Sequence, residues 1–167
     1  MSNYLDDIKG LQITTEALVL WKDKLLMQKR SSSAKHFPDS WSIPGGHVDI
    51  GEDLVTTARR EVLEESAVDL KDYDLKLVGN FINYHSDKEK TWLVSVFFTR
   101  IIEFQDCIDT DEGETKWIDI AELTNFEIFP PIEHFLFDVL KDQSKIIYMV
   151  GKWRDKQLIE VLSKSLV

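Results

Sequence analysis

Residues 45–68 read GGHVDIGEDLVTTARREVLEESAV, and this stretch decides the fold. Its spacing predicts an α-helix over residues 52–66. At about 100° per residue, one stripe of that helix is apolar, formed by Leu54, Val55, Ala58 and Val62. Asp49 and Asp53 lie near the expected helix start, where acids stabilise the positive end of the helix dipole. We therefore expect this helix to pack one face on a core and to expose the other.

Three glutamates, Glu61, Glu64 and Glu65, occupy the arc beside the apolar stripe. Like charges at these spacings destabilise a helix by roughly a few tenths of a kcal/mol per pair, and no lysine lies among them. A bound cation would remove that cost. Oxygen ligands at this density suit Mg²⁺, with Mn²⁺ as a substitute, because both are hard ions that bridge carboxylates to phosphates. The helix therefore predicts a metal and phosphate site.

Pro44, Gly45 and Gly46 precede the helix and predict a sharp bend that leaves backbone groups open. A carbonyl oxygen in such a bend can approach a metal or a substrate. Taken alone, this tripeptide is typical of any turn that ends a strand, so its weight comes from the glutamates that follow.

The same stretch resembles the Nudix box, whose pattern is Gly, five residues, Glu, seven residues, then Arg-Glu-aliphatic-any-Glu-Glu-any-Gly-aliphatic. The matching residues are Gly46, Glu52, Arg60, Glu61, Val62, Glu64, Glu65 and Val68. Ala67 departs from the pattern, because it stands where the family has the glycine that ends the helix. A left-handed backbone there costs a side chain about 1 to 2 kcal/mol, so we expect the helix end to fray or to lengthen.

The resemblance implies roles for these residues. Glu61, Glu64 and Glu65, with the carbonyl of Gly46, would hold divalent ions, and Glu52 would pair with Arg60. The ions would neutralise phosphate charge and align a water molecule for in-line attack at phosphorus. The implied activity is that of a MutT-like, magnesium-dependent nucleotide pyrophosphohydrolase.

The carboxylate that takes the proton from this water stays open. Glu61 and Glu64 are candidates on the helix. Some family members use an acid from a later loop, where Glu112 and Glu114 are available.

Lys29 and Arg30, at the end of the first expected hairpin, are candidates for binding the phosphates of the substrate.

The resemblance leaves several substrates open, because the pockets for base and sugar lie in variable loops. We expect a nucleoside triphosphate, cleaved to a monophosphate and pyrophosphate. ADP-ribose or another nucleotide sugar is the next candidate, followed by capped RNA ends and dinucleoside polyphosphates. A catalytically silent domain that senses a nucleotide is an alternative of a different class, although such a domain would not need all three glutamates.

Apolar runs outside the box predict the remaining elements. Residues 17–21 and 25–27 flank one polar turn, and residues 75–84 and 92–102 flank another, which predicts two β-hairpins. Amphipathic spacing predicts two later helices, over residues 131–141 and 154–165. This order predicts an α/β (α+β) fold with a mixed β-sheet between helices, which agrees with the Nudix α/β/α sandwich.

Composition limits the class of protein. The length of 167 residues predicts one domain over residues 1–167, and Cys107, the single cysteine, excludes an internal disulfide. A net charge of -10 would repel duplex nucleic acid and still allow a small nucleotide held through a metal. No run is long and apolar enough for a membrane helix, and acids stand near the N-terminus where a signal peptide has cations, so we expect a cytoplasmic protein. Dimers are common in the family, so the resemblance allows a homodimer, and the sequence does not determine the oligomeric state.

Overall fold

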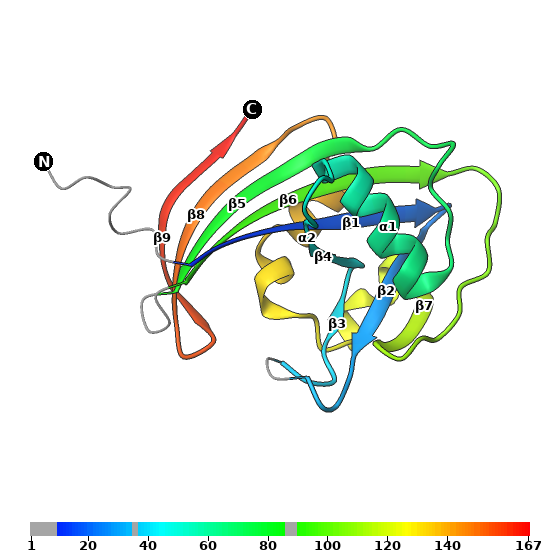
Figure 1. Cartoon of the computed structure of the whole chain (residues 1–167), viewed down its shortest axis with the longest axis horizontal. Helices are drawn as coiled ribbons and strands as arrows, with labels where there is room; N and C mark the ends of the chain where they lie inside the picture. The colour runs from blue at the N-terminus through cyan, green and yellow to red at the C-terminus, as the bar shows by residue number, and fades with distance from the viewer. Residues whose placement is uncertain (1–9, 35–36, 86–89) are drawn as a thin grey trace, which may run out of the picture.

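The described residues form a curved mixed sheet in the strand order β3-β2-β1-β6-β5-β8-β9, with β4 paired to β1 and β7 paired to β2 (Figure 1). The structure is a computed structural model that describes residues 10–34, 37–85 and 90–167. The strands are β1 (Leu11–Trp21), β2 (Lys24–Arg30), β3 (Trp41–Ser42), β4 (Gly45–His47), β5 (Lys76–His85), β6 (Lys90–Ile101), β7 (Gly113–Asp119), β8 (Ile147–Arg154) and β9 (Gln157–Leu166). The helices are α1 (Leu54–Ser66), the 3₁₀ helix η1 (Ile120–Asn125) and α2 (Pro130–Lys141).

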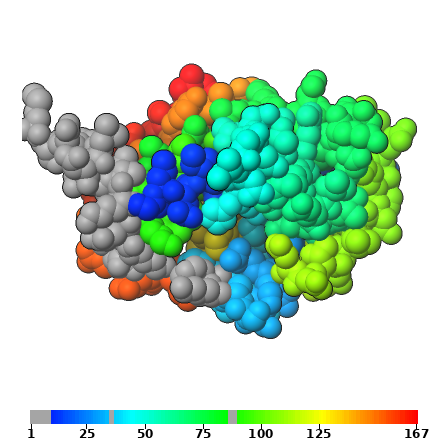
Figure 2. Space-filling view, in the orientation of Figure 1, coloured from blue at the N-terminus to red at the C-terminus, as the bar shows by residue number. Residues whose placement is uncertain are grey.

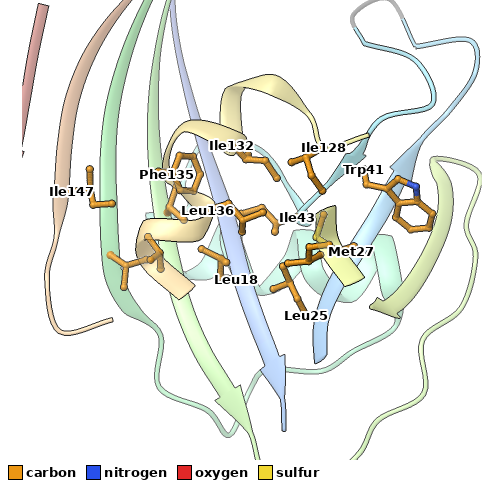
Figure 3. Close-up of a cluster of buried hydrophobic side chains, with 14 of the residues drawn as sticks. Leu18, Leu25, Met27, Trp41, Ile43, Ile128, Ile132, Phe135, Leu136 and Ile147 are labelled. Carbon is orange, nitrogen blue, oxygen red and sulfur yellow. The ribbon is translucent and has the colours of Figure 1, made fainter. Parts of the chain in front are cut away.

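The two α-helices cover opposite faces of this sheet, and each closes its own core (Figure 1). Ile132, Phe135 and Leu136 of α2 join the larger cluster of buried side chains, which includes Leu18 of β1 (Figure 3). Val62 of α1 packs with smaller apolar side chains on the other face. The predicted sandwich, with a mixed sheet between helices, is therefore confirmed.

Both predicted hairpins are present. Strands β1 and β2 are antiparallel around the turn at residues 22–23, and β5 and β6 are antiparallel over most of their length. The sheet is mixed because β1 runs parallel to β6 and β5 runs parallel to β8. No helix among the described residues has the length and apolar composition needed to cross a membrane.

Helix α1 begins and ends for local reasons. The Asp53 carboxylate accepts hydrogen bonds from the backbone N–H groups of Val55 (2.9 Å) and Thr56 (3.0 Å), which makes Asp53 the N-cap. At the other end, Ala67 adopts the left-handed conformation with φ 61°, and its N–H bonds to the carbonyl of Leu63. The expected fraying or lengthening does not occur. The alanine accepts the conformation for which the family uses glycine.

The helix predicted over residues 154–165 is wrong, because this segment forms a β-turn and strand β9. Asp155 and Lys156 both have positive φ, at 50° and 67°, which is the geometry of a tight hairpin turn. Strand β9 then pairs antiparallel with β8. Its apolar residues are spaced in a way that also fits a helix, and pairing with the preceding strand β8 decided between the two.

Strands β1 and β2 diverge soon after their turn, and this divergence opens the sheet. Within the described residues their pairing is confined to the end next to the turn, at Leu20–Leu25 and Trp21–Lys24. Beyond it, β4 occupies the edge of β1 and β3 occupies the edge of β2. The bend between β3 and β4 therefore passes through the gap and brings the start of α1 to its rim.

Candidate active site

A cleft of about 780 Å³ begins at this gap and continues over the sheet face that carries α2. Figure 2 shows the surface hollowed between the start of β1 and the segment that follows β2. One end of the cleft is acidic, with Glu16, Glu61, Glu65 and Glu112 around Gly45 and Gly46. The other end is lined by aromatic rings and an amide, from Asn83, His85, Trp92 and Trp153. Phe37 and Phe129 lie at its border.

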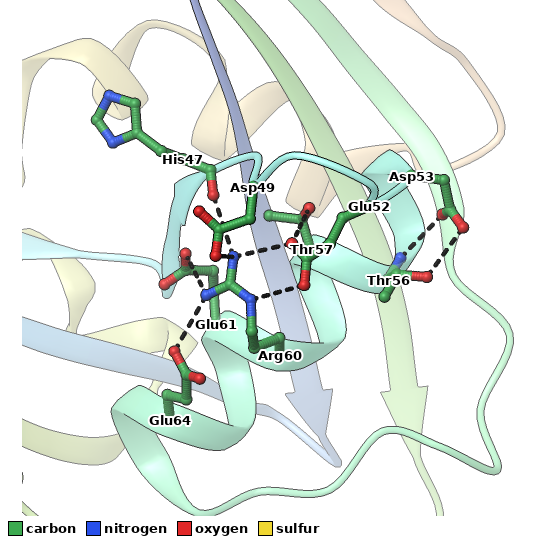
Figure 4. Close-up of polar contacts among 9 residues, drawn as sticks. All are labelled: His47, Asp49, Glu52, Asp53, Thr56, Thr57, Arg60, Glu61 and Glu64. Carbon is green, nitrogen blue, oxygen red and sulfur yellow. Dashed lines mark hydrogen bonds and ion pairs between the residues drawn. The ribbon is translucent and has the colours of Figure 1, made fainter.

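Arg60 links the acids at the start of α1 (Figure 4). Its guanidinium donates to both carboxylate oxygens of Glu52, at 2.9 and 3.0 Å, and to Glu61 at 2.8 Å and Glu64 at 3.1 Å. It also donates to the backbone carbonyl of His47 at 3.1 Å. These bonds from Arg60, with one from Thr57, lower the pKa of Glu52 to about 2. Arg60 thus fixes the loop at residues 47–52 to the face of the helix.

The Glu61 carboxylate lies against Gly46. A Cβ atom at position 46 would overlap that carboxylate, so the close approach requires glycine. Burial raises the pKa of Glu61, the Arg60 hydrogen bond opposes the shift, and the charges of Glu64 and Glu112 add to it. The carboxyl group therefore sits beside an open backbone in a region of excess negative charge.

Glu65 is buried, with 4% of its surface exposed, and its Oε2 accepts the N–H of Gly45 at 2.8 Å. Burial raises the pKa of Glu65 to about 9, and a hydrogen-bonding contact with the Glu112 carboxyl contributes to the shift. Two carboxyl groups in such contact need a proton or a cation between them. Glu112, from the turn before β7, is an exposed residue at this end of the cleft.

The three helical glutamates do not converge on one point. Glu61 and Glu65 face the cleft, whereas the Glu64 side chain is 59% exposed and reaches Arg60. No group of three or more acids, histidines or cysteines stands at metal-ligand spacing within residues 10–34, 37–85 and 90–167. The donor chemistry nevertheless fits a hard cation, because carboxyl oxygens of Glu61, Glu65 and Glu112 crowd together beside the glycine turn.

The structure divides the other expected site residues into two groups. Arg30 lines the cleft with its guanidinium 4.7 Å from the Phe129 ring, whereas Lys29 lies outside it and pairs with Asp39. Glu112 lines the cleft, whereas Glu114 lies outside it and pairs with Lys116.

Sequence reasoning missed three polar side chains that line the cleft. Thr15 Oγ1, Glu16 Oε2 and Gln28 Nε2 are enclosed and have no hydrogen-bond partner within the described part of the chain. Each such atom carries a desolvation cost of roughly 1 to 3 kcal/mol that a ligand or water can relieve. Burial raises the pKa of Glu16 to about 7. The signal in the sequence that could have revealed Glu16 is its position as an acid directly before the apolar run 17–21.

Comparison with known proteins places these residues in a family. The profile of the NUDIX domain matches residues 11–140. The "Uncharacterized Nudix hydrolase YvcI" of Bacillus subtilis (strain 168) is 26% identical over 134 residues, which cover 80% of this chain and 82% of that protein. The "RNA pyrophosphohydrolase" of Pelagibacter ubique (strain HTCC1062) is 31% identical over 128 residues, covering 66% of this chain and 78% of that protein.

Other similarities are more local or concern the fold. The "m7GpppN-mRNA hydrolase NUDT17" of Danio rerio is 35% identical over 79 residues, which are 40% of this chain and 26% of that protein. The chain therefore matches about a quarter of that relative's length. The crystal structure of a mutator MutT protein from Bacillus halodurans has a TM-score of 0.73 at 22% identity, covering 93% of this chain and 97% of that one. At this identity the likeness shows the fold.

A bifunctional NMN adenylyltransferase/ADP ribose pyrophosphatase from Francisella tularensis, in complex with AMP and a Mn ion, gives a TM-score of 0.62 at 21% identity. The match covers 80% of this chain and 42% of that chain. Both structural neighbours thus carry the same arrangement of sheet and helices.

Proposed function

The chain belongs to the Nudix hydrolase family, and from that premise we propose that it hydrolyses a phosphoanhydride bond of a nucleotide with the help of Mg²⁺. The substrate that we propose is a nucleoside triphosphate, which would give a monophosphate and pyrophosphate. One observation carries the proposal. Carboxyl groups of Glu61, Glu65 and Glu112 gather beside the glycine turn, at one end of a cleft large enough for a nucleotide.

Divalent metal use is general in the family, and this acidic end supplies suitable donors. Glu61 and Glu65, with the carbonyl of Gly46, would hold the metal, and Glu64 would join them by rotating its exposed side chain. A divalent metal bound there neutralises phosphate charge and lowers the pKa of a coordinated water. We assign Mg²⁺ because the donors are oxygens, and Mn²⁺ can replace it.

The remaining site residues would bind the substrate or hold the other site residues in position. Arg60 and Glu52 would keep Glu61 and the loop at residues 47–52 in place. Arg30, over the Phe129 ring at the border of the cleft, would attract the phosphates of the substrate. Glu112 is our choice for the general base, because it reaches the cleft from an exposed turn, close to the helical acids.

A panel of substrates tests this function. Purified protein is incubated with GTP, dGTP, ATP, ADP-ribose, GDP-mannose, a diadenosine polyphosphate and a capped RNA, with Mg²⁺, with Mn²⁺ or with EDTA. Products are separated by ion-exchange chromatography. We expect metal-dependent release of pyrophosphate and a monophosphate from triphosphates. A protein that binds nucleotides tightly and cleaves none of them would instead be a sensor, and the proposal would be rejected.

A second substrate class has a specific observation in its favour. Two of the relatives carry names for RNA 5′-end chemistry, the mRNA hydrolase NUDT17 and the RNA pyrophosphohydrolase. The capped RNA in the panel, together with a 5′-triphosphorylated RNA, tests it. A kcat/KM for either RNA above that for every free triphosphate would move the assignment to RNA ends.

A further inference from the structure

The far end of the cleft is built in part by a segment that the family profile does not match. The profile ends at residue 140, whereas strand β8 begins at Ile147 and contributes Trp153 to the cleft. In the sheet, β8 lies parallel to β5, and Trp153 stands opposite His85. A segment outside the matched residues 11–140 therefore forms part of the cleft wall, and it makes a specific contact there.

Trp153 fixes the orientation of the Asn83 amide. The indole Nε1–H donates to Asn83 Oδ1 at 3.0 Å, and both side chains are buried. An indole nitrogen can donate and cannot accept, so the amide oxygen must face the indole. The amide NH₂ of Asn83, with its two donors, therefore faces away from Trp153.

The indole of Trp153 packs against the His85 ring, and Gly151 leaves space beside its nitrogen. The rings of Trp153 and His85 are stacked, 5.9 Å apart and 11° from parallel. Behind them, a Cβ atom on Gly151 would come within 3.2 Å of the indole nitrogen and 3.3 Å of Asn83 Oδ1. Glycine at position 151 thus leaves room for this hydrogen bond, and the amide is positioned before a ligand arrives.

Next to Asn83, two half-buried rings line the cleft. His85 and Trp92 meet edge to face with centroids 4.7 Å apart, and Trp92 is paired with Asn83 across β5 and β6. Aromatic faces of this kind stack on nucleobases. An amide beside them can read the edge of a base that stacks there.

Strand register separates this subsite from the acidic end. Gly46 pairs with Thr15 of β1, whereas Trp92 pairs with Gln12, three residues farther along the same strand. Asn83 lies two strands from β1 on one side and Gly46 lies one strand from β1 on the other, so the subsite is roughly 10 Å along the strands and roughly 14 Å across them from Gly46. The sugar and phosphates of a nucleoside triphosphate bridge such a separation.

We propose that Asn83, positioned by Trp153, selects nucleotides whose base carries a carbonyl oxygen at position 6, such as guanine and hypoxanthine, over adenine, which carries an amino group there. This base selection rests on the proposed function, since it presupposes that the substrate of this cleft is a nucleotide. The two N–H donors of Asn83 match the O6 and N7 acceptors of guanine, whereas adenine presents an amino group at position 6 that cannot accept them. Trp153 is a positioning residue in this scheme and does not touch the reacting atoms.

The test compares GTP, ITP and ATP in turnover and in binding. We expect kcat/KM for GTP and ITP to exceed that for ATP by roughly tenfold or more. Trp153→Phe removes the N–H and keeps a ring, so it should reduce this preference to about threefold or less, mainly through KM. Trp117→Phe is the matched control, because Trp117 also donates its Nε1–H, to the Gln105 carbonyl, and does not line the cleft. It should keep the full preference.

A second variant reverses the chemistry. Asn83→Asp replaces the donors with an acceptor and should shift the preference toward ATP. Thermal melting and near-ultraviolet circular dichroism verify that both variants fold. Equal kcat/KM for GTP and ATP in the unmodified protein, or an unchanged preference in folded Trp153→Phe, would overturn the proposal. Isothermal titration of GTP and ATP in EDTA measures the preference without turnover, so a protein that binds selectively and cleaves nothing would contradict the proposed function alone.

Discussion

The Arg60 guanidinium donates hydrogen bonds to both carboxylate oxygens of Glu52, at 2.9 and 3.0 Å, although Arg60 lies eight residues later in the chain. This two-bond contact joins the loop at residues 47–52 to helix α1, which carries Glu61, Glu64 and Glu65. Because the same guanidinium reaches Glu61 at 2.8 Å, the position of a cleft acid depends on a pair that lies outside the cleft.

Arg60→Lys should lower kcat/KM by roughly 10- to 100-fold, because a lysine ammonium cannot form the two parallel bonds and Glu61 would lose its support. Steady-state kinetics over a range of Mg²⁺ concentrations measure this, and the Mg²⁺ requirement should rise as well. Arg59→Lys is the control, since Arg59 donates to the Tyr73 carbonyl and has no bond to the cleft acids. Equal losses in the two variants would contradict the assigned role.

Glu65→Gln should change activity and stability in opposite directions. The carboxyl is buried and its pKa is raised to about 9, whereas the unfolded chain is ionised at pH 7.5, so folding without metal requires the uptake of a proton and is opposed by that requirement. We expect a higher melting temperature in EDTA together with a turnover at least about 100-fold lower, as for removal of a metal ligand. In addition, Mg²⁺ should stabilise the unmodified protein and leave the variant nearly unchanged. Glu133→Gln, at an exposed position of α2, should alter neither property.

Glu112 and Glu114 offer a matched pair, two residues apart on either side of Gly113. Glu112→Gln should lower kcat by roughly 100-fold, because Glu112 lines the cleft and contacts Glu65. Glu114→Gln should have little effect, since Glu114 pairs with Lys116 outside the cleft. The reverse order of effects would move the general base to Glu114.

Glu16→Gln should stabilise the metal-free protein in a pH-dependent way. The folded pKa of about 7 lies above the ordinary value of 4.5, so the unfolded chain loses its proton first and stability falls as pH rises from 4.5 to 7. The gain from glutamine should therefore be absent below pH 4.5 and reach on the order of 1 to 3 kcal/mol above pH 7. Urea unfolding in EDTA at pH 4, 6 and 8 measures it, and a gain that is constant across pH would exclude this origin.

Ala67→Gly should stabilise the fold by about 1 kcal/mol, because Ala67 has a left-handed backbone with φ 61° that glycine adopts without steric cost. Chemical unfolding of the two proteins at one pH measures the difference. Catalytic constants should stay within about twofold, since the Ala67 side chain is exposed and lies outside the cleft. A loss of stability would show that neighbouring contacts have adapted to alanine.

Much of the fold follows from local signals in the sequence. Asp53 caps α1 through its own carboxylate, and the apolar stripe with Val62 packs on the sheet as its period requires. The antiparallel pairs β1–β2 and β5–β6 follow from polar runs between apolar runs in the sequence. The C-terminal strand was not predicted, because the spacing of its apolar residues also fits a helix, and only the tight turn at Asp155 and Lys156 with the pairing of β9 to the preceding strand β8 decides for a strand.

The sequence by itself determined which acids the helix contributes to the site, since their spacing on one helix and the glycines before it are local properties. Only the tertiary structure decided how those acids divide. The Glu65 carboxyl accepts a hydrogen bond from the Gly45 N–H, whereas the Glu64 carboxylate accepts one from Arg60, although the two glutamates are adjacent in the chain. It also decided that Glu16, Asn83 and Trp153 share the cleft. The physical reason is that side chains on separate strands become neighbours through backbone pairing, which depends on the register of the whole sheet.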